Sequence, residues 1–131
     1  DIDEIIKAIS DINTTPTDSM VVEAKKGLDW RKEFNRGGTN VGAVRARQII
    51  AKENLSPSTV KRMFSFFSRH EVDKQAQGFR TGEKGYPSAG RIAWALWGGD
   101  AGFTWSTKVR NQLEKEKEKF LVDNLDKKDG N

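Results

Sequence analysis

The stretch from Tyr86 to Gly102, YPSAGRIAWALWGGDAG, carries start and stop signals for a short, almost fully buried helix. Pro87 restricts the backbone that precedes it, and the Ser88 side chain can cap the free N–H groups of its first turn. Gly98 can adopt the left-handed conformation that ends a helix. We therefore expect about ten helical residues, or roughly 15 Å of helix.

Both sides of this helix carry apolar or aromatic side chains. Ile92 and Leu96 fall on one face at helical spacing, and Arg91 and Trp94, three residues apart, can stack as a cation-π pair on the other. Such a helix must be covered on two sides. We expect the rest of the chain to pack around it.

The remaining chain predicts a single all-α domain of five or six short helices. In the helix that follows Pro57, apolar side chains recur at i, i+3, i+4 and i+7, which is typical of an amphipathic helix. The ranges predicted as helical are 1–12, 16–34 with Thr15 as cap, 41–53 and 57–70, and a last helix capped by Thr104 that runs to Leu121 after a turn over 100–103. The residues expected in or beside the core are Phe64, Phe67, Trp94, Leu96 and Trp97.

Three units follow from this pattern. Residues 1–15 form an amphipathic helix and linker, residues 16–122 the helical domain, and residues 123–131 a tail predicted to be disordered. The first helix carries a strip of isoleucines and is too short to be stable alone, so it must dock on the domain, on another copy or on a larger protein.

Composition restricts the classes of function. The chain has 131 residues, is 35% hydrophobic and has no apolar run long enough for a membrane span, so we expect one soluble domain with no membrane partner. Its acidic start does not resemble an export signal, which favours an intracellular location. Because there is no cysteine and one histidine, we predict no metal and no other cofactor.

Charge is unevenly distributed along the chain. Residues 25–91 carry fifteen basic and six acidic side chains, a net charge of +9, while the whole chain carries +4. Such a segment is typical of a surface that binds a polyanion, either nucleic acid or an acidic protein, although basic solvated faces are also common.

The quoted stretch also carries a resemblance. Together with LDWR at 28–31, LSPSTV at 55–60 and RHEVDK at 69–74, it resembles a small domain of tailed bacteriophages and prophages. That domain is found alone or appended to head-morphogenesis proteins such as prohead proteases. The resemblance covers about residues 19–110 and implies a location in the host cytoplasm or the virion, but no settled biochemical activity.

The helices over 41–53 and 57–70, joined by a tight corner, have the form of a helix-turn-helix. In that motif the start of the second helix reaches base edges in the major groove of DNA. The first helix is expected to project its cations outward. The predicted nucleic-acid contacts are Arg45, Arg47, Ser58, Thr59, Lys61, Arg62 and Arg69, and DNA is the expected partner in preference to RNA.

The segment 71–87 is predicted to be a long irregular loop, in which Arg80 and Lys84, with Arg91 beyond it, are candidate phosphate contacts. His70, Glu71 and Asp73 are adjacent and lack a spaced partner, which favours a structural role for them.

No nucleophile with its base, paired carboxylates or phosphate-binding glycine loop appears in its required context, so we predict no catalytic residues and no enzyme. The sequence thus leaves two hypotheses. The first is a phage-type nucleic-acid-binding accessory domain, and the alternative is a head-assembly or protein-interaction module that binds no nucleic acid. The oligomeric state stays open.

Overall fold

The computed structural model describes the backbone of residues 1–129 and the side chains of residues 1–125. Its described part holds no strand, and the predicted all-helical architecture is confirmed. The elements in chain order are α1 (Ile2–Ser10), α2 (Asp18–Phe34), α3 (Asn40–Ile50), α4 (Pro57–His70), the 3-10 helix η1 (Glu71–Gln75), α5 (Ala89–Leu96) and α6 (Gly99–Asp129).

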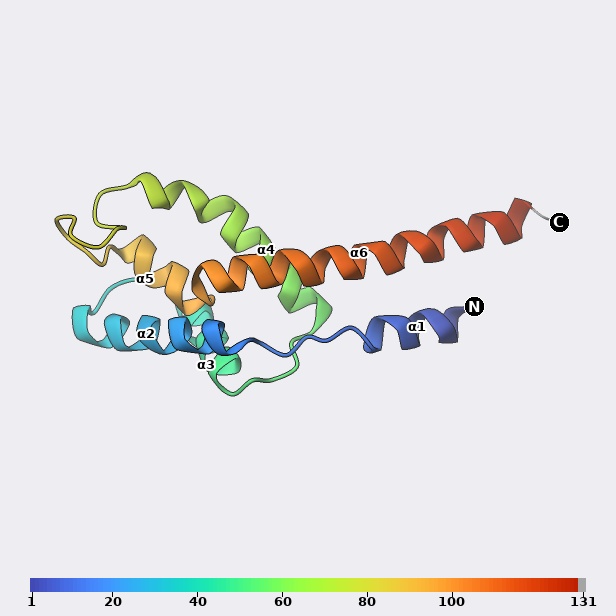
Figure 1. Ribbon diagram of the computed structural model, residues 1–131, viewed down its shortest axis with the longest axis horizontal. Helices are drawn as coiled ribbons and strands as arrows, with labels where there is room; N and C mark the ends of the chain where they lie inside the picture. The colour runs from blue at the N-terminus through green and yellow to red at the C-terminus, as the bar shows by residue number, and fades with distance from the viewer. Residues whose placement is uncertain (130–131) are drawn as a thin grey trace.

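The central helix is α5, as its apolar sequence predicts. It begins after Ser88, whose Oγ accepts a hydrogen bond of 3.0 Å from the N–H of Arg91. It ends at Trp97, after which Gly98 adopts a φ of 109°. It packs against α2, α3, α4, η1 and α6, so the body of the protein is built around it (Figure 1).

Close packing on α5 depends on glycines in the neighbouring helices. A Cβ atom on Gly27 of α2 would lie 2.7 Å from the backbone nitrogen of Leu96, and one on Gly42 of α3 would lie 3.3 Å from the Leu96 Cδ1 atom. Because a Cβ atom does not fit at 2.7 Å, α2 can approach the α5 backbone only with glycine at position 27.

The core lies between α5 and α4. Phe67 packs edge-on against Trp94, with ring centroids 4.8 Å apart, and both side chains are buried. Leu96 is fully buried, Trp97 is buried, and Phe64 borders the core beside Phe103. The predicted core residues therefore gather as expected.

Two helix starts differ from their predictions. The cap of α2 is Thr17, whose Oγ1 accepts from the N–H of Met20, so Pro16 lies before the helix, where it is buried. The last helix begins at Gly99 instead of after Thr104, because Gly98 and Gly99, both with positive φ, make the turn out of α5.

The last helix also continues further than predicted. Residues 123–129, expected to be disordered, belong to α6, while 130–131 lie outside the described residues. The far part of α6 extends beyond the body of the protein, and α1 lies antiparallel beside it (Figure 1). We call α1 together with residues 114–125 of α6 the arm.

Candidate nucleic-acid interface

The predicted nucleic-acid contacts lie mainly on α3 and α4. The start of α4 forms as predicted: the Ser56 Oγ accepts a hydrogen bond of 3.2 Å from the N–H of Thr59, and Pro57 occupies the first turn. The residues 40–50 and 57–70 carry five Arg and Lys side chains and no Asp or Glu. This pair of helices is therefore the most uniformly basic part of the structure described here.

A groove of about 420 Å³ lies along the exposed side of α4. It brings together three of the predicted cations with one aromatic side chain; its lining residues are Val41, Lys61, Arg62, Ser65, Arg69 and Trp97. Trp97, from the end of α5, was not predicted as part of a site. No local signal could have placed it there, since the tertiary packing alone brings α5 to this groove.

Among these cations, Lys61 is partly compensated. Its Nζ lies 3.5 Å from a carboxylate oxygen of Glu114 on α6, in an exposed ion pair. Arg62 and Arg69 have no carboxylate within 4 Å among residues 1–125. Two exposed guanidinium groups therefore face the solvent along the groove.

Arg45 was expected to project outward, and that prediction is wrong. Its side chain is 5% exposed and lies with Cζ 5.2 Å from the ring centroid of Trp97. The other neighbour of this indole is Phe66, stacked at 4.6 Å with an interplanar angle of 10°. Arg45 is covered because α5 carries Trp97 across α3, which the sequence of α3 does not reveal.

The buried guanidinium of Arg45 is incompletely paired. Its Nη1 donates to Oε1 of Gln48, but Nε has no hydrogen-bond partner among the described residues. Burial, and then the positive charge of Arg62, lower the pKa of Arg45 below its usual value. The two causes are distinct but act in the same direction, since burial removes water from the guanidinium and Arg62 repels its charge.

The other residues predicted at the start of α4 differ in exposure. Ser58 is exposed and lies 3.1 Å from the Ser56 Oγ, oxygen to oxygen. Thr59 is buried, and its Oγ1 accepts a hydrogen bond from Ser56. The prediction that Thr59 contacts a base edge is therefore wrong, because its hydroxyl is used within the cap.

The two helices follow each other as a helix-turn-helix would, yet they share only α5 as a packing partner and do not pack on each other. α3 lies against α2 and α5, whereas α4 lies against α6, η1 and α5. Phe66 and Phe67 both point into the core, so α4 is covered more widely than a helix that enters a DNA groove. The accessible part of α4 is its cationic edge.

Arg47 lies apart from this groove. It lines a second recess of about 650 Å³ with Arg31, Lys32 and Arg36, around the Gly37–Gly38 turn between α2 and α3. These three cations were not predicted as a site, although their clustering beside two glycines was visible in the sequence. Arg36 is already engaged, since its Nη2 donates to the backbone oxygen of Pro87 at 3.0 Å.

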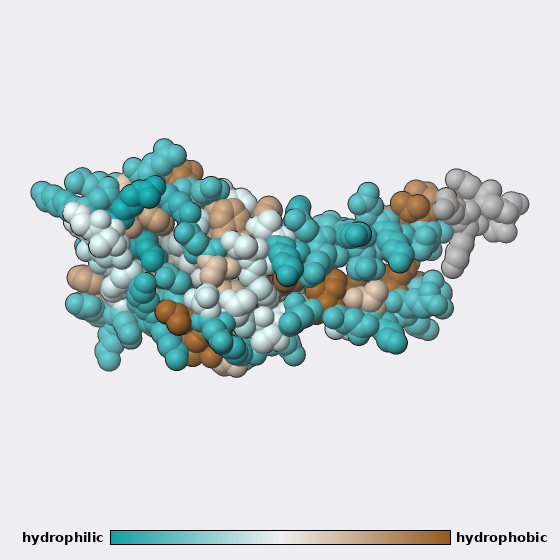
Figure 2. Space-filling model, viewed as in Figure 1, coloured by the Kyte–Doolittle hydropathy of each residue, from teal (hydrophilic) through white to brown (hydrophobic). Residues whose placement is uncertain are grey.

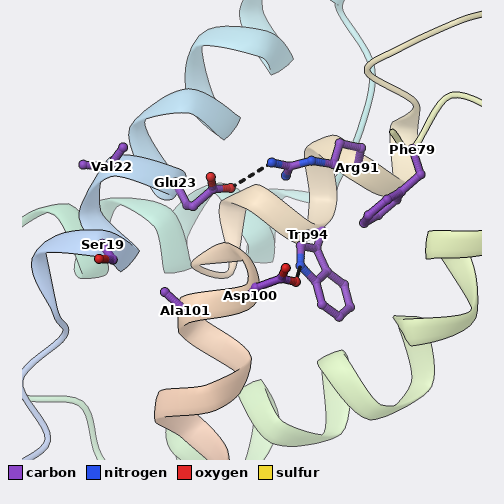
Figure 3. A pocket seen from close by; sticks show the side chains of 8 residues that line it. All are labelled: Ser19, Val22, Glu23, Phe79, Arg91, Trp94, Asp100 and Ala101. Carbon is purple, nitrogen blue, oxygen red and sulfur yellow. Dashed lines mark hydrogen bonds and ion pairs between the residues drawn. The ribbon is translucent and has the colours of Figure 1, made fainter. Parts of the chain in front are cut away.

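The loop candidates also separate. Arg80 and Lys84 have exposed side chains, but Arg91 points inward, and its Nη2 lies 3.1 Å from Oε2 of Glu23 on α2 (Figure 3). Its guanidinium lies over the rings of Trp30 and Phe79, 5.0 and 5.8 Å from their centroids. Arg91 is therefore a structural cation and not a free phosphate contact.

The predicted stacking of Arg91 on Trp94 is also wrong. The cation over the Trp94 ring is Lys74, at 4.8 Å, and Trp94 donates its Nε1–H to Oδ1 of Asp100 at 2.9 Å (Figure 3). Lys74 lies 2.9 Å from the same carboxylate oxygen. These contacts engage Asp100 in the lining of the hollow between α2, α5 and α6, whereas the Nη1 atom of Arg91 there is buried and has no hydrogen-bond partner among the described residues.

His70 has the features of a structural residue. Its Nδ1 lies 3.1 Å from Oδ2 of Asp73, and its ring stacks on Phe66 at 4.5 Å. In the part of the chain that the structure describes, His, Asp and Glu side chains form no group of three that could hold a metal ion. The pair closes the junction between α4 and η1.

Within residues 1–129, no helix combines the length and apolar character needed to cross a membrane. Comparison with protein-family models, with curated proteins and with solved structures finds no match for this chain.

Proposed function

We propose that this chain is a nucleic-acid-binding accessory domain that holds phosphate groups along the α3–α4 groove. The observation that carries the proposal is the buried Arg45, whose charge has no carboxylate partner within 4 Å among residues 1–125. Buried charges in proteins are costly unless an opposite charge accompanies them. An anion in the adjacent groove would supply that charge.

The groove cations support the same proposal. Arg62 lowers the pKa of Arg45, so the two positive charges oppose each other in the free protein. A phosphate group of the nucleic acid beside Arg62 would relieve this repulsion. Its neutralisation by the protein would also release the counterions bound to the nucleic-acid backbone. Because the repulsion between Arg45 and Arg62 destabilises the unbound protein, its relief favours binding of a polyanion.

The expected partner is DNA in preference to RNA. The resemblance of the chain to domains of tailed phages makes the virion or the host cytoplasm the expected location. Because Thr59 is covered and Phe66 ties α4 to the core, contacts to phosphates account for the binding better than contacts to bases. We therefore expect affinity with little sequence preference.

The test is a titration of labelled duplex DNA, single-stranded DNA and RNA at about 50 mM and about 200 mM salt. The variant Lys61→Ala/Arg62→Ala should flatten the dependence of log K on log salt by up to about two. The matched control is Lys25→Ala/Lys108→Ala, which removes the same charge from two exposed positions outside the groove and outside the predicted contacts, and which should change the slope less.

No binding of the unmodified protein to any nucleic acid at the lower salt concentration would overturn the proposal. An equal loss of affinity in the two double variants would show that only the net charge matters. The groove would then no longer be the proposed binding site.

A second candidate function is self-association through the arm, which rests on a separate observation. Five large aliphatic side chains on the arm are exposed: Ile2, Ile6, Leu121, Val122 and Leu125. Figure 2 shows hydrophobic residues at the surface there. An antiparallel helix pair of this kind is half of a four-helix bundle, which a second copy related by two-fold symmetry would complete.

Charge favours a second copy over a polyanion at the arm. The two parts of the arm, residues 2–10 and 114–125, together carry four Lys against six Asp and Glu, a net charge of −2, so two arms can face each other without strong repulsion, whereas a polyanion would be repelled. Light scattering should then show a dimer that Leu121→Ser/Leu125→Ser converts to a monomer. The control Val72→Ser changes an exposed valine outside the arm and should leave the dimer intact; a monomeric unmodified protein would end this candidate.

A further inference from the structure

The exposed edge of α4 carries a repeated unit. Ser58 and Arg62 are followed seven residues later by Ser65 and Arg69, so Ser-x-x-x-Arg occurs twice. All four side chains are exposed. Because seven residues make nearly two turns, the two units lie on the same edge of the helix, about 10 Å apart.

We infer that these two units are two phosphate clamps with a fixed separation, and that the partner is double-stranded DNA. The inference rests on the proposed function, since it assumes that the groove binds nucleic acid. Each unit combines a guanidinium, which can hold a phosphate with two parallel hydrogen bonds, with a serine hydroxyl that can donate a further one. Serine is also small, which lets the phosphate backbone approach the helix closely.

The separation fits the duplex. The major groove of B-form DNA is about 12 Å wide, so two cations about 10 Å apart can each reach one of its two phosphate rows. The major groove of double-stranded RNA is deep and narrow, and it does not present phosphates in this way. A flexible single strand of nucleic acid can adjust its phosphates to any separation of the two cations. A fixed separation therefore does not increase the affinity for a single strand.

The aromatic side chains argue against a single strand. Proteins that bind single strands without sequence preference stack bases on accessible aromatic rings. Trp97, in the groove, is 8% exposed and is covered by Arg45 and Phe66. Among the described side chains, Phe34 is the one aromatic group that is well exposed, and the Arg36 guanidinium lies over its ring, 5.4 Å from the centroid. The groove thus offers phosphate contacts without a stacking surface.

The test changes the position of a charge while keeping its number. The variant Ser68→Arg/Arg69→Ser has the composition of the unmodified protein, but it rotates the second cation by about 100° around α4, away from the edge that carries Arg62. The new arginine lies seven residues after Lys61 instead, a cation whose charge is already compensated in part by Glu114. Ser68 is exposed, so the exchange touches no packed side chain. Binding is measured against one sequence as duplex DNA, duplex RNA and single-stranded DNA, alongside Arg69→Ala.

We expect the unmodified protein to bind duplex DNA at least tenfold more tightly than the single strand or duplex RNA. Ser68→Arg/Arg69→Ser should lose duplex affinity nearly as far as Arg69→Ala, and its salt dependence should flatten by about 0.9, the amount for one phosphate. Unchanged thermal unfolding would confirm that both variants fold.

Three results would overturn the inference while the proposed function survives. They are duplex affinity of the exchanged variant equal to that of the unmodified protein, single-stranded DNA bound as tightly as the duplex, and duplex RNA bound as tightly as duplex DNA. Absence of binding to all three nucleic acids is a different result, because it removes the proposed function itself.

Discussion

The guanidinium of Arg91 on α5 pairs with the carboxylate of Glu23 on α2, with Nη2 and Oε2 3.1 Å apart. Both side chains are largely buried, and the rings of Trp30 and Phe79 lie against the guanidinium. The pair joins two residues 68 positions apart, so it holds α2 against the central helix.

Glu23→Gln is expected to lower the free energy of unfolding by about 2 to 3 kcal/mol. The substitution keeps the size of the side chain but leaves the positive charge of Arg91 buried and without its partner, which is the costly way to break such a pair. Urea unfolding followed by tryptophan fluorescence measures the change. The control Lys26→Ala removes a more exposed contact to the same carboxylate, together with the contact of the Lys26 Nζ to the Trp30 ring at 5.5 Å, and should cost less than Glu23→Gln. Similar losses in the two variants would contradict the importance of Arg91.

Gly27→Ala is expected to destabilise the protein although alanine favours a helix more than glycine does. The added Cβ would lie 2.7 Å from the backbone nitrogen of Leu96, so α2 and α5 must move apart. Overpacking of this kind costs about 1 to 3 kcal/mol, which exceeds the gain of up to about 1 kcal/mol in helix propensity. Lys25→Ala, at an exposed position of the same helix, gives the effect of alanine without the clash. A more stable Gly27→Ala protein would show that the two helices can separate freely.

Arg45→Met should separate stability from binding. Methionine has a similar length and can occupy the place beside Trp97, and it removes a buried charge that has no acidic partner in the described structure. Replacing a buried charged group by an apolar one is often neutral or stabilising. We therefore expect unchanged or higher thermal stability together with weaker binding of duplex DNA. A strongly destabilised variant would mean that the hydrogen bond of Arg45 to Gln48 matters more than its charge.

Asp100 should contribute stability that disappears in acid. Burial by itself raises its pKa, but the hydrogen bond and charge of Lys74, with smaller effects of Trp94 and Arg91, outweigh burial and bring the pKa below its usual value. A lowered pKa means that the folded state favours the carboxylate, so this contribution is present above the unfolded pKa of about 4 and is lost as the pH falls through the lower folded value.

The corresponding variant is Asp100→Asn. Because the Asp100 side chain is 78% exposed, solvent screens the ion pair and we expect a loss of at most about 1 kcal/mol at neutral pH. Unfolding curves at neutral pH and near pH 3 measure it, and the difference between the two proteins should shrink at the acidic pH. A difference that grows on acidification would contradict the sign of the pKa shift.

The sequence by itself determined where most of the helices lie. Ser56 with Pro57, and Ser88 with Gly98, mark the ends of α4 and α5 because capping hydrogen bonds and left-handed turns involve residues within one turn of each other. The apolar spacing in α4 likewise identifies its buried face, since helical periodicity is local. The same reasoning failed at Thr104, because Gly98 and Gly99 together complete the turn into α6 and the turn expected over 100–103 is not needed.

Only the tertiary structure decided what each polar side chain does. Arg45 and Arg47 are two residues apart and look equivalent in the sequence, yet Trp97 from α5 covers the first and leaves the second exposed. Arg91 likewise finds Glu23, far away in the chain, instead of its near neighbour Trp94. The physical reason is that burial and charge pairing depend on which helix packs over a residue, and the order of residues along one helix carries little information about its neighbours in space.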